Sequence, residues 1–143
     1  MKLLLDTCAI SALRKADINP RVKELLDTVD EKDVFLSVIS FGELVKGISL
    51  LQESHGKQQL LSWLGGIERM FEDRTLAIDQ ETARIWGEIT AKARKTGRTI
   101  PASDGLIAAS ALRHGLHLLT RNSRDFMATG VMLIDPWSTH STP

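Results

Sequence analysis

The sequence has a single cysteine, no long apolar run and no excess charge of either sign, and each absence excludes a class of protein. Cys8 alone cannot form an intramolecular disulfide and is typical of a reducing compartment. We expect it to be a small buried hydrophobic residue. The apolar runs are too short for a transmembrane helix, and Asp6 interrupts the N-terminal leucines too early for a signal sequence. We therefore expect a cytoplasmic protein.

The charge balance also limits how the chain could bind nucleic acid. Eighteen basic and eighteen acidic residues give a formal net charge of zero. Such a chain lacks the overall field that drives tight non-specific binding, so shape, local basic residues or a metal would have to supply the affinity. The 143 residues, 43% of them hydrophobic, suit one globular domain. We expect that domain over residues 1–137 and a loose tail over residues 138–143.

Strands and helices alternate along the chain. Leu3-Leu4-Leu5 is typical of a strand buried on both faces. Further strands are predicted at 34–38, 75–78, 116–120 and 131–134, and helices at 9–15, 19–29, 40 to about 54, 57–72, 79–95, 101–114 and 122–127. Right-handed crossovers then predict an α/β fold, with a central parallel sheet of about five strands between two helical layers.

Four acidic residues are predicted to meet at one edge of this sheet. Asp6 ends the first strand, and Glu43 and Asp125 lie in helices that follow later strands. Helices that follow parallel strands begin at the carboxyl edge, where open α/β folds bind ligands. Asp104 opens a helix that leads into a strand, so its start should lie at the same edge.

Each acid also has a purely structural interpretation. Ser40 and Glu43 fit a capping box, and Asn122 with Asp125 is a looser version of it. Asp6 could be an N-cap, and Asp104 could interact favourably with the dipole at the start of its helix.

Together the four acids favour a metal. Two ionised carboxylates 4 Å apart repel by about 4 kcal/mol at an effective dielectric near 20, whereas a helix N-terminus relieves only about 0.3–1 kcal/mol. Either some acids are protonated or a cation lies between them. Oxygen ligands without a nearby histidine or cysteine select Mg²⁺ or Mn²⁺. Such an ion could activate a water for attack on a phosphodiester.

Several polar residues are candidates for a supporting role. Arg121 and Arg124 lie close enough in sequence to the fourth acid to hold a phosphate oxygen, although plain surface solvation is the alternative. The hydroxyls of Thr7 and Ser40 could reach a metal-bound water or could simply cap helices.

The ordered set of motifs resembles the PIN-domain family, and specifically its VapC-type toxins. The motifs are Leu3-Leu-Leu-Asp6-Thr7, Ser37-Val-Ile-Ser-Phe-Gly-Glu43-Leu-Val-Lys-Gly47, Ile100-Pro-Ala-Ser-Asp104 with the residues that follow, Leu119-Thr-Arg-Asn122-Ser-Arg-Asp125-Phe126, and the closing stretch Val131 to Trp137. The match covers nearly the whole chain in the expected order.

The resemblance implies a single PIN-like domain and a ribonuclease that depends on Mg²⁺ or Mn²⁺. It assigns metal ligation and catalysis to Asp6, Glu43, Asp104 and Asp125. We also expect Thr7, Arg121, Asn122 and Arg124 to bind substrate. It also implies a homodimer and a small DNA-binding antitoxin whose C-terminal segment covers the active site, with larger assemblies through that antitoxin. Cys8 departs from the family, which commonly has asparagine there, and the fourth acid varies in position between the places of Asn122 and Asp125.

Two other functions remain open on the sequence alone. A phosphatase of the haloacid dehalogenase type would use Asp6 as a nucleophile, but it calls for a second aspartate at the position of Cys8. A PIN-like module that binds RNA or protein without cutting would have no use for four carboxylates, which cost stability when idle.

Overall fold

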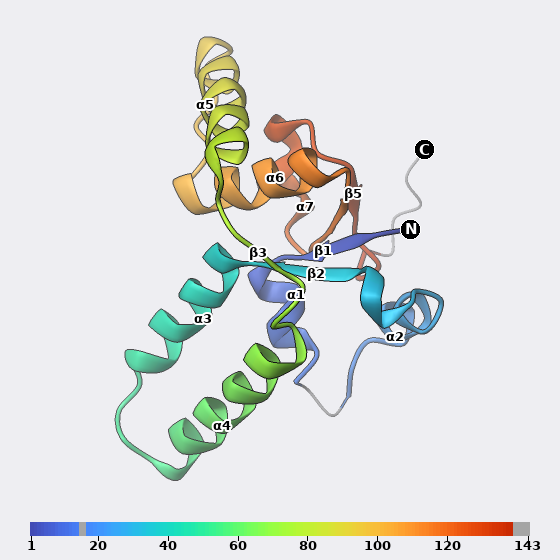
Figure 1. Ribbon diagram of the computed structural model, residues 1–143, viewed down its shortest axis with the longest axis vertical. Helices are drawn as coiled ribbons and strands as arrows, with labels where there is room; N and C mark the ends of the chain where they lie inside the picture. Colours follow the sequence, from blue (N-terminus) through green and yellow to red (C-terminus); the bar gives the residue numbers. More distant parts are fainter. Residues whose placement is uncertain (15–16, 139–143) are drawn as a thin grey trace.

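The computed structural model describes residues 1–14 and 17–138 and has helices on both faces of a five-stranded sheet (Figure 1). The strand order is β3-β2-β1-β4-β5, and all four pairings are parallel. The predicted three-layer α/β fold is therefore confirmed. Of the predicted C-terminal tail, residues 139–143 lie outside the described residues, as does Lys15 at the end of the first predicted helix. None of the helices described is long and apolar enough to cross a membrane.

The strands are short, and β1 lies at the centre of the sheet. Their bounds are β1 (Leu3–Leu5), β2 (Val34–Ser37), β3 (Thr75–Leu76), β4 (His117–Leu119) and β5 (Leu133–Ile134). The three leucines of β1 are at most 1% exposed. Alternate side chains of a strand point to opposite faces, so Leu5 packs into one core cluster and Leu4 into the other. This burial explains why a run of three consecutive leucines forms the central strand.

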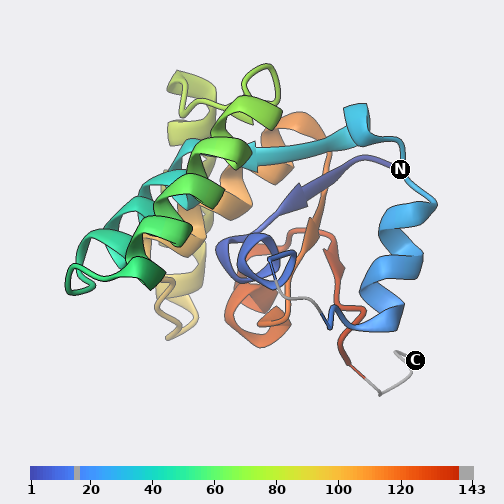
Figure 2. The ribbon, with the colours of Figure 1, turned by 90° about the horizontal axis from the view of Figure 1, so that it is seen from below.

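The helices divide between the two faces of the sheet (Figure 1). Their bounds are α1 (Thr7–Ala12), α2 (Pro20–Asp27), α3 (Val38–Ser49), α4 (His55–Met70), α5 (Gln80–Lys95), α6 (Ala102–His114) and α7 (Ser123–Phe126), with 3-10 turns η1 (Glu31–Asp33) and η2 (Met127–Thr129). Helices α1 to α4 pack with Leu5, and α5 to α7 with Leu4. Figure 2 shows α3 and α4 running side by side away from the sheet.

The switch from β2 to α3 occurs earlier than the sequence predicts. Ser37 is the N-cap of α3, and its hydroxyl accepts a hydrogen bond from the Ile39 amide at 3.1 Å. The predicted capping box of Ser40 with Glu43 is therefore wrong. Ser40 lies inside the helix, fully buried, with no hydrogen-bond partner for its hydroxyl among the described residues. The contact of Ser40 with a metal-bound water stays a prediction.

Helices α5 and α6 approach closely because α6 has a glycine, which lacks a side chain, where it faces α5. A Cβ added to Gly105 would lie 2.9 Å from Cδ1 of Trp86, so any larger residue would displace that indole ring. The contact seats the first turn of α6 against α5. Asp104 is the neighbour of Gly105 and is positioned by this contact.

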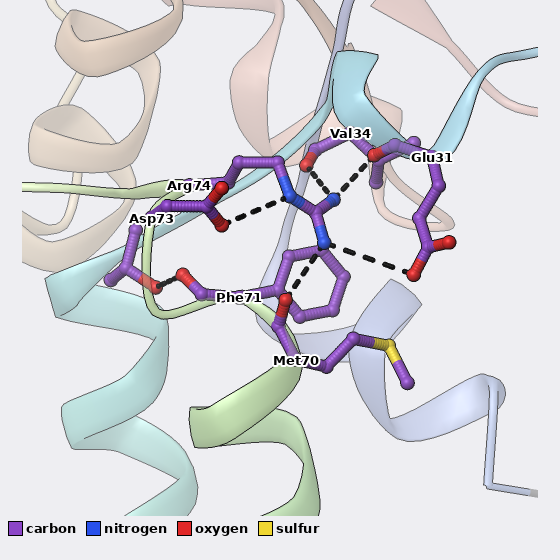
Figure 3. Close-up of polar contacts among 7 residues, drawn as sticks. Glu31, Val34, Met70, Phe71, Asp73 and Arg74 are labelled. Carbon is purple, nitrogen blue, oxygen red and sulfur yellow. Dashed lines mark hydrogen bonds and ion pairs between the residues drawn. The ribbon is translucent and has the colours of Figure 1, made fainter.

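Arg74 connects four elements at the end of the sheet where β2 begins (Figure 3). This end lies opposite the one at which β1 leads into α1 and β2 leads into α3. Its guanidinium donates to the backbone carbonyls of Val34 at 2.8 Å, Met70 at 2.8 Å and Glu31. It also lies over the ring of Phe71, 4.5 Å from the centroid. With only 10% of the side chain exposed, Arg74 joins η1, β2 and the end of α4 at the start of β3.

Candidate active site

Parallel strands bring Asp6, Glu43 and Asp125 to one edge of the sheet. Asp6 follows β1, Glu43 lies in α3 after β2, and Asp125 lies in α7 after β4. Asp104 joins them from the first turn of α6. The charges of Glu43 and Asp125 raise the pKa of Asp6, and those of Asp125, Glu43 and Asp6 raise the pKa of Asp104. We refer to these four residues as the acidic cluster.

Asp6 is the most buried member of the acidic cluster, at 3% exposed. Its Oδ1 accepts from the Ala9 amide at 2.7 Å, which caps α1, and its Oδ2 accepts from the Thr120 hydroxyl at 2.5 Å. Burial is the main cause that raises the pKa of Asp6, and these two hydrogen bonds oppose it. Asp6 is therefore both a helix cap and a member of the cluster, so its two interpretations are compatible.

Glu43 is held by a hydroxyl from the neighbouring helix. Thr7, the first residue of α1, donates from Oγ1 to Oε1 of Glu43 at 2.6 Å. This bond fixes one oxygen of an exposed carboxylate beside Asp6. Thr7 thus positions an acidic side chain in the structure, which is a more specific contact than the sequence predicted for it.

Asp104 is half-buried, and its carboxylate has neither a hydrogen bond nor an ion pair within the described ranges. Burial is the largest cause that raises the pKa of Asp104, followed by the charges of the other three acids. Its helix begins at Ala102 without a side-chain cap, so Asp104 does not serve as one. The carboxylate is placed where it is electrostatically unfavourable, which a helix dipole offsets only in part.

No basic side chain of the described residues forms an ion pair with the acidic cluster. The ion pairs among residues 1–14 and 17–138 involve Glu31, Glu53, Asp73, Asp79 and Glu81, and none of the four clustered acids. Hard carboxylate oxygens are the donors that Mg²⁺ and Mn²⁺ prefer, so the donor set fits such an ion. Among the described residues, no group of three Asp, Glu, His or Cys side chains is arranged so that it could hold a metal ion as the side chains stand. Mg²⁺ commonly binds through one or two carboxylates and keeps several waters.

Cys8 is exposed, so its predicted burial as a small hydrophobic residue is wrong. Its sulfur accepts a hydrogen bond from Nδ2 of Asn122 at 3.0 Å. Partial desolvation and the adjacent charge of Asp6 raise the pKa of the Cys8 thiol, which stays protonated at neutral pH. Asn122 makes no side-chain cap on α7, so the looser capping box predicted with Asp125 is also wrong. The amide instead contacts the N-terminus of α1.

The two predicted phosphate-binding arginines are exposed and lie in different hollows. Arg121 lines one with Thr7, Cys8 and Asn122. Arg124 lines another with Asp104 and Asp125. The hollow of Arg124 includes two members of the acidic cluster, whereas the hollow of Arg121 includes Thr7, which holds Glu43, but none of the four acids.

Thr120 belongs to the site although no sequence argument selected it. It is fully buried, donates to Asp6, and accepts from the Asn122 amide at 2.9 Å. Its position in the chain could have indicated a role in the site, because Thr120 directly follows β4 as Asp6 follows β1. A polar residue at the end of a buried strand was the clue that could have found it.

Comparisons with known proteins identify the family of the chain. The PIN domain family model matches residues 3–130. Toxin FitB of Neisseria gonorrhoeae is 38% identical over 136 residues, which cover 94% of this chain and 98% of FitB. VapC ribonuclease Y4jK of Sinorhizobium fredii is 31% identical, with 94% and 97% covered. The structure of FitAB bound to an IR36 DNA fragment contains a chain that is 34% identical and superposes with a TM-score of 0.88, covering 99% of both chains. A chain matched from residue 3 to residue 130, with acids from four elements at one sheet edge, belongs to the PIN-domain family.

Proposed function

We propose that this chain is a metal-dependent endoribonuclease and the toxin of a type II toxin–antitoxin pair. The observation that carries the proposal is the acidic cluster: the charges of its members raise the pKa of Asp6 and the pKa of Asp104, and none of the four carboxylates forms an ion pair with a basic residue of the described ranges. Relatives named toxin FitB and VapC ribonuclease Y4jK support the same activity. Membership of the PIN-domain family disfavours the dehalogenase-type phosphatase.

In this proposal Asp6, Glu43, Asp104 and Asp125 hold Mg²⁺, with Mn²⁺ as an alternative. A bound divalent ion supplies Lewis acidity, which polarises the phosphodiester and lowers the pKa of water. The chain supplies the positioning. Thr120 and the Ala9 amide fix both oxygens of Asp6, and Thr7 fixes Glu43. Arg121 and Arg124 bind phosphate oxygens of the RNA, and Asn122 orients the loop between β4 and α7.

The proposal extends to the partners and to the domain. We propose that residues 1–137 form the nuclease domain. We also propose that the protein is a homodimer, acts in the cytoplasm and assembles with a small DNA-binding antitoxin. The FitAB structure, in which the complex is bound to a DNA fragment, supports a partner of this kind. We further propose that the antitoxin's C-terminal segment covers the acidic cluster.

The direct test is RNA cleavage by the purified chain with and without added metal. We expect cutting of RNA in Mg²⁺ or Mn²⁺ and none in EDTA, because the acidic cluster cannot activate water alone. Restoring Mg²⁺ after EDTA treatment should restore cutting. Metal-independent cutting would point to a contaminating nuclease. Absence of cutting under every metal condition would instead favour a binding module.

Metal binding should also change the stability of the protein in a pH-dependent way. The raised pKa values of Asp6 and Asp104 mean that the folded protein retains these protons to higher pH than the unfolded chain. Their contribution to the metal-free stability is therefore greatest below the usual aspartate value near 3.8 and falls as the pH rises through the raised values. Mg²⁺ at about ten times its dissociation constant adds about 1.4 kcal/mol.

We accordingly expect 10 mM Mg²⁺ to raise the Tm by about 3–6 °C at pH 7.5 and by less at pH 5, for a dissociation constant of about 1 mM. Differential scanning fluorimetry at both pH values measures this. KCl at matched ionic strength is the control for general screening. Equal shifts at the two pH values, or the same shift with KCl, would contradict binding at the acidic cluster.

A further inference from the structure

The turn after α5 places a basic side chain beside the acidic cluster. Gly97 has a positive φ of 79°, and its amide donates to the Arg94 carbonyl at 3.0 Å. The Arg98 amide donates to the Ala93 carbonyl at 2.9 Å. These two bonds form a Schellman-type end, which reverses the chain so that Arg98 returns along the last turn of α5. The chain then passes into the start of α6, where Asp104 lies.

Two adjoining hollows extend from the acidic cluster past Arg98. The inner hollow has a volume of about 570 Å³ and includes Arg98, Asp104, Arg124 and Asp125 in its lining. The outer hollow has a volume of about 460 Å³ and is lined by the last two turns of α5, by Arg98 and by η2. Arg98, Met127 and Ala128 line both. Volumes of about 300–1,000 Å³ are typical of ligand pockets, so each hollow has room for a group of nucleotide size.

The basic side chains along these hollows have no acidic partner among the described residues. Lys92, Arg98 and Arg124 are exposed, and none of them takes part in an ion pair within the described ranges. A cation in the last turn of α5 interacts favourably with the helix dipole. This interaction is a sufficient structural reason for a lysine at position 92. Arg98 lies beyond the helix end, and Arg124 belongs to α7, so the dipole of α5 explains neither.

We infer that Lys92, Arg98 and Arg124 form a phosphate-binding track for the backbone of single-stranded RNA, leading away from the acidic cluster. The inference rests on the proposed ribonuclease function and adds residues that bind substrate away from the cut bond. A chain with zero net charge has no overall attraction for RNA, so its affinity depends on local groups of this kind. The side chain of Met127, 66% exposed between the hollows, offers an apolar surface to a base.

Two double variants that change charge equally provide the test. Lys92→Gln with Arg98→Gln removes two charges from the track. Arg94→Gln with Lys95→Gln removes two exposed charges from the same end of α5 that line neither hollow. The probe is a fluorescent 12-nucleotide oligouridylate in EDTA, with its affinity measured between 25 and 200 mM KCl. In parallel, KM and kcat are measured in Mg²⁺ on a single-stranded RNA that the wild type cuts.

We expect the track variant to bind the oligonucleotide about tenfold more weakly at low salt, with the slope of log K against log salt reduced by about 1.4, or 0.7 for each lost phosphate contact. Its KM should rise by a similar factor at unchanged kcat, while the control variant stays close to the wild type. If both variants change equally, or neither does, the track is wrong although the ribonuclease function stands. A wild type that neither binds nor cuts RNA would overturn the function and the track together.

Discussion

Replacement of Asp104 by asparagine is expected to reduce RNA cleavage in Mg²⁺ by about 10²–10³-fold while the metal-free protein keeps or increases its stability. Within the described ranges this carboxylate has no hydrogen bond and no ion pair. An isosteric amide therefore breaks no structural contact and removes one charge from the acidic cluster. Burial and the charges of three neighbouring acids already raise the pKa of Asp104, so its ionised form destabilises the fold.

The two effects are measured separately on one preparation. Single-turnover cleavage in Mg²⁺ gives the activity, and the urea midpoint in EDTA gives the stability. Asp27→Asn is the matched control, because Asp27 is an exposed aspartate in α2, away from the acidic cluster. Loss of activity in step with unfolding would favour a structural role for Asp104. Full activity in the folded variant would exclude it as a metal ligand.

Asp6 is a less clean position for the same experiment. Its carboxylate caps α1 and accepts from Thr120, so Asp6→Asn changes structural contacts together with the charge. Asparagine is also a good N-cap, and we still expect an intact fold with cleavage abolished. The comparison with Asp104 separates the contribution of charge from that of the cap.

The sequence predicted the meeting of the acids because topology alone determines it. Residues that follow parallel strands must lie at one edge, so Asp6, Glu43 and Asp125 are placed by strand order. Asp104 needed the reverse argument, that a helix leading into a strand starts at this edge. Both arguments use only the alternation of apolar runs with helical periodicity, which is the strongest signal in a single sequence.

The contacts that orient the acids could not be predicted in the same way. Thr120 and Asp6 are 114 positions apart, and so are Asn122 and Cys8. Such pairs depend on side-chain rotamers and on the registry between β1 and β4, which no local pattern encodes. The capping box at Ser40 failed for a related reason. Ser37 and Ser40 are both good caps by type, and the end of the β2 pairing decides between them.

Arg74→Met is expected to lower the free energy of unfolding by about 1–3 kcal/mol, because the part-buried carbonyl of Val34 and the more exposed carbonyls of Glu31 and Met70 lose their shared donor. Methionine keeps the volume over Phe71 but leaves the Glu31, Val34 and Met70 carbonyls without their shared donor (Figure 3). The contacts of Arg74 with the exposed carboxylates of Asp73 and Glu31 contribute little, because solvent screens them. Asp73→Asn should therefore change stability by less than about 0.5 kcal/mol and serves as the control.

Because Arg74 lies far from the acidic cluster, Arg74→Met should lower stability and keep activity, whereas Asp104→Asn should lower activity and keep stability. Arg74 binds the first residue of β2, whereas the acidic cluster lies beyond the last. Urea titration should show a lower midpoint for Arg74→Met at an unchanged m-value, and the folded fraction at low temperature should cut RNA at the wild-type rate. Arg74→Lys should be intermediate, because an ammonium lacks the planar fork that serves three carbonyls. A variant that stays as stable as the wild type would show that the carbonyls find other donors, and lost cleavage in the fully folded variant would show that the two ends of β2 are coupled.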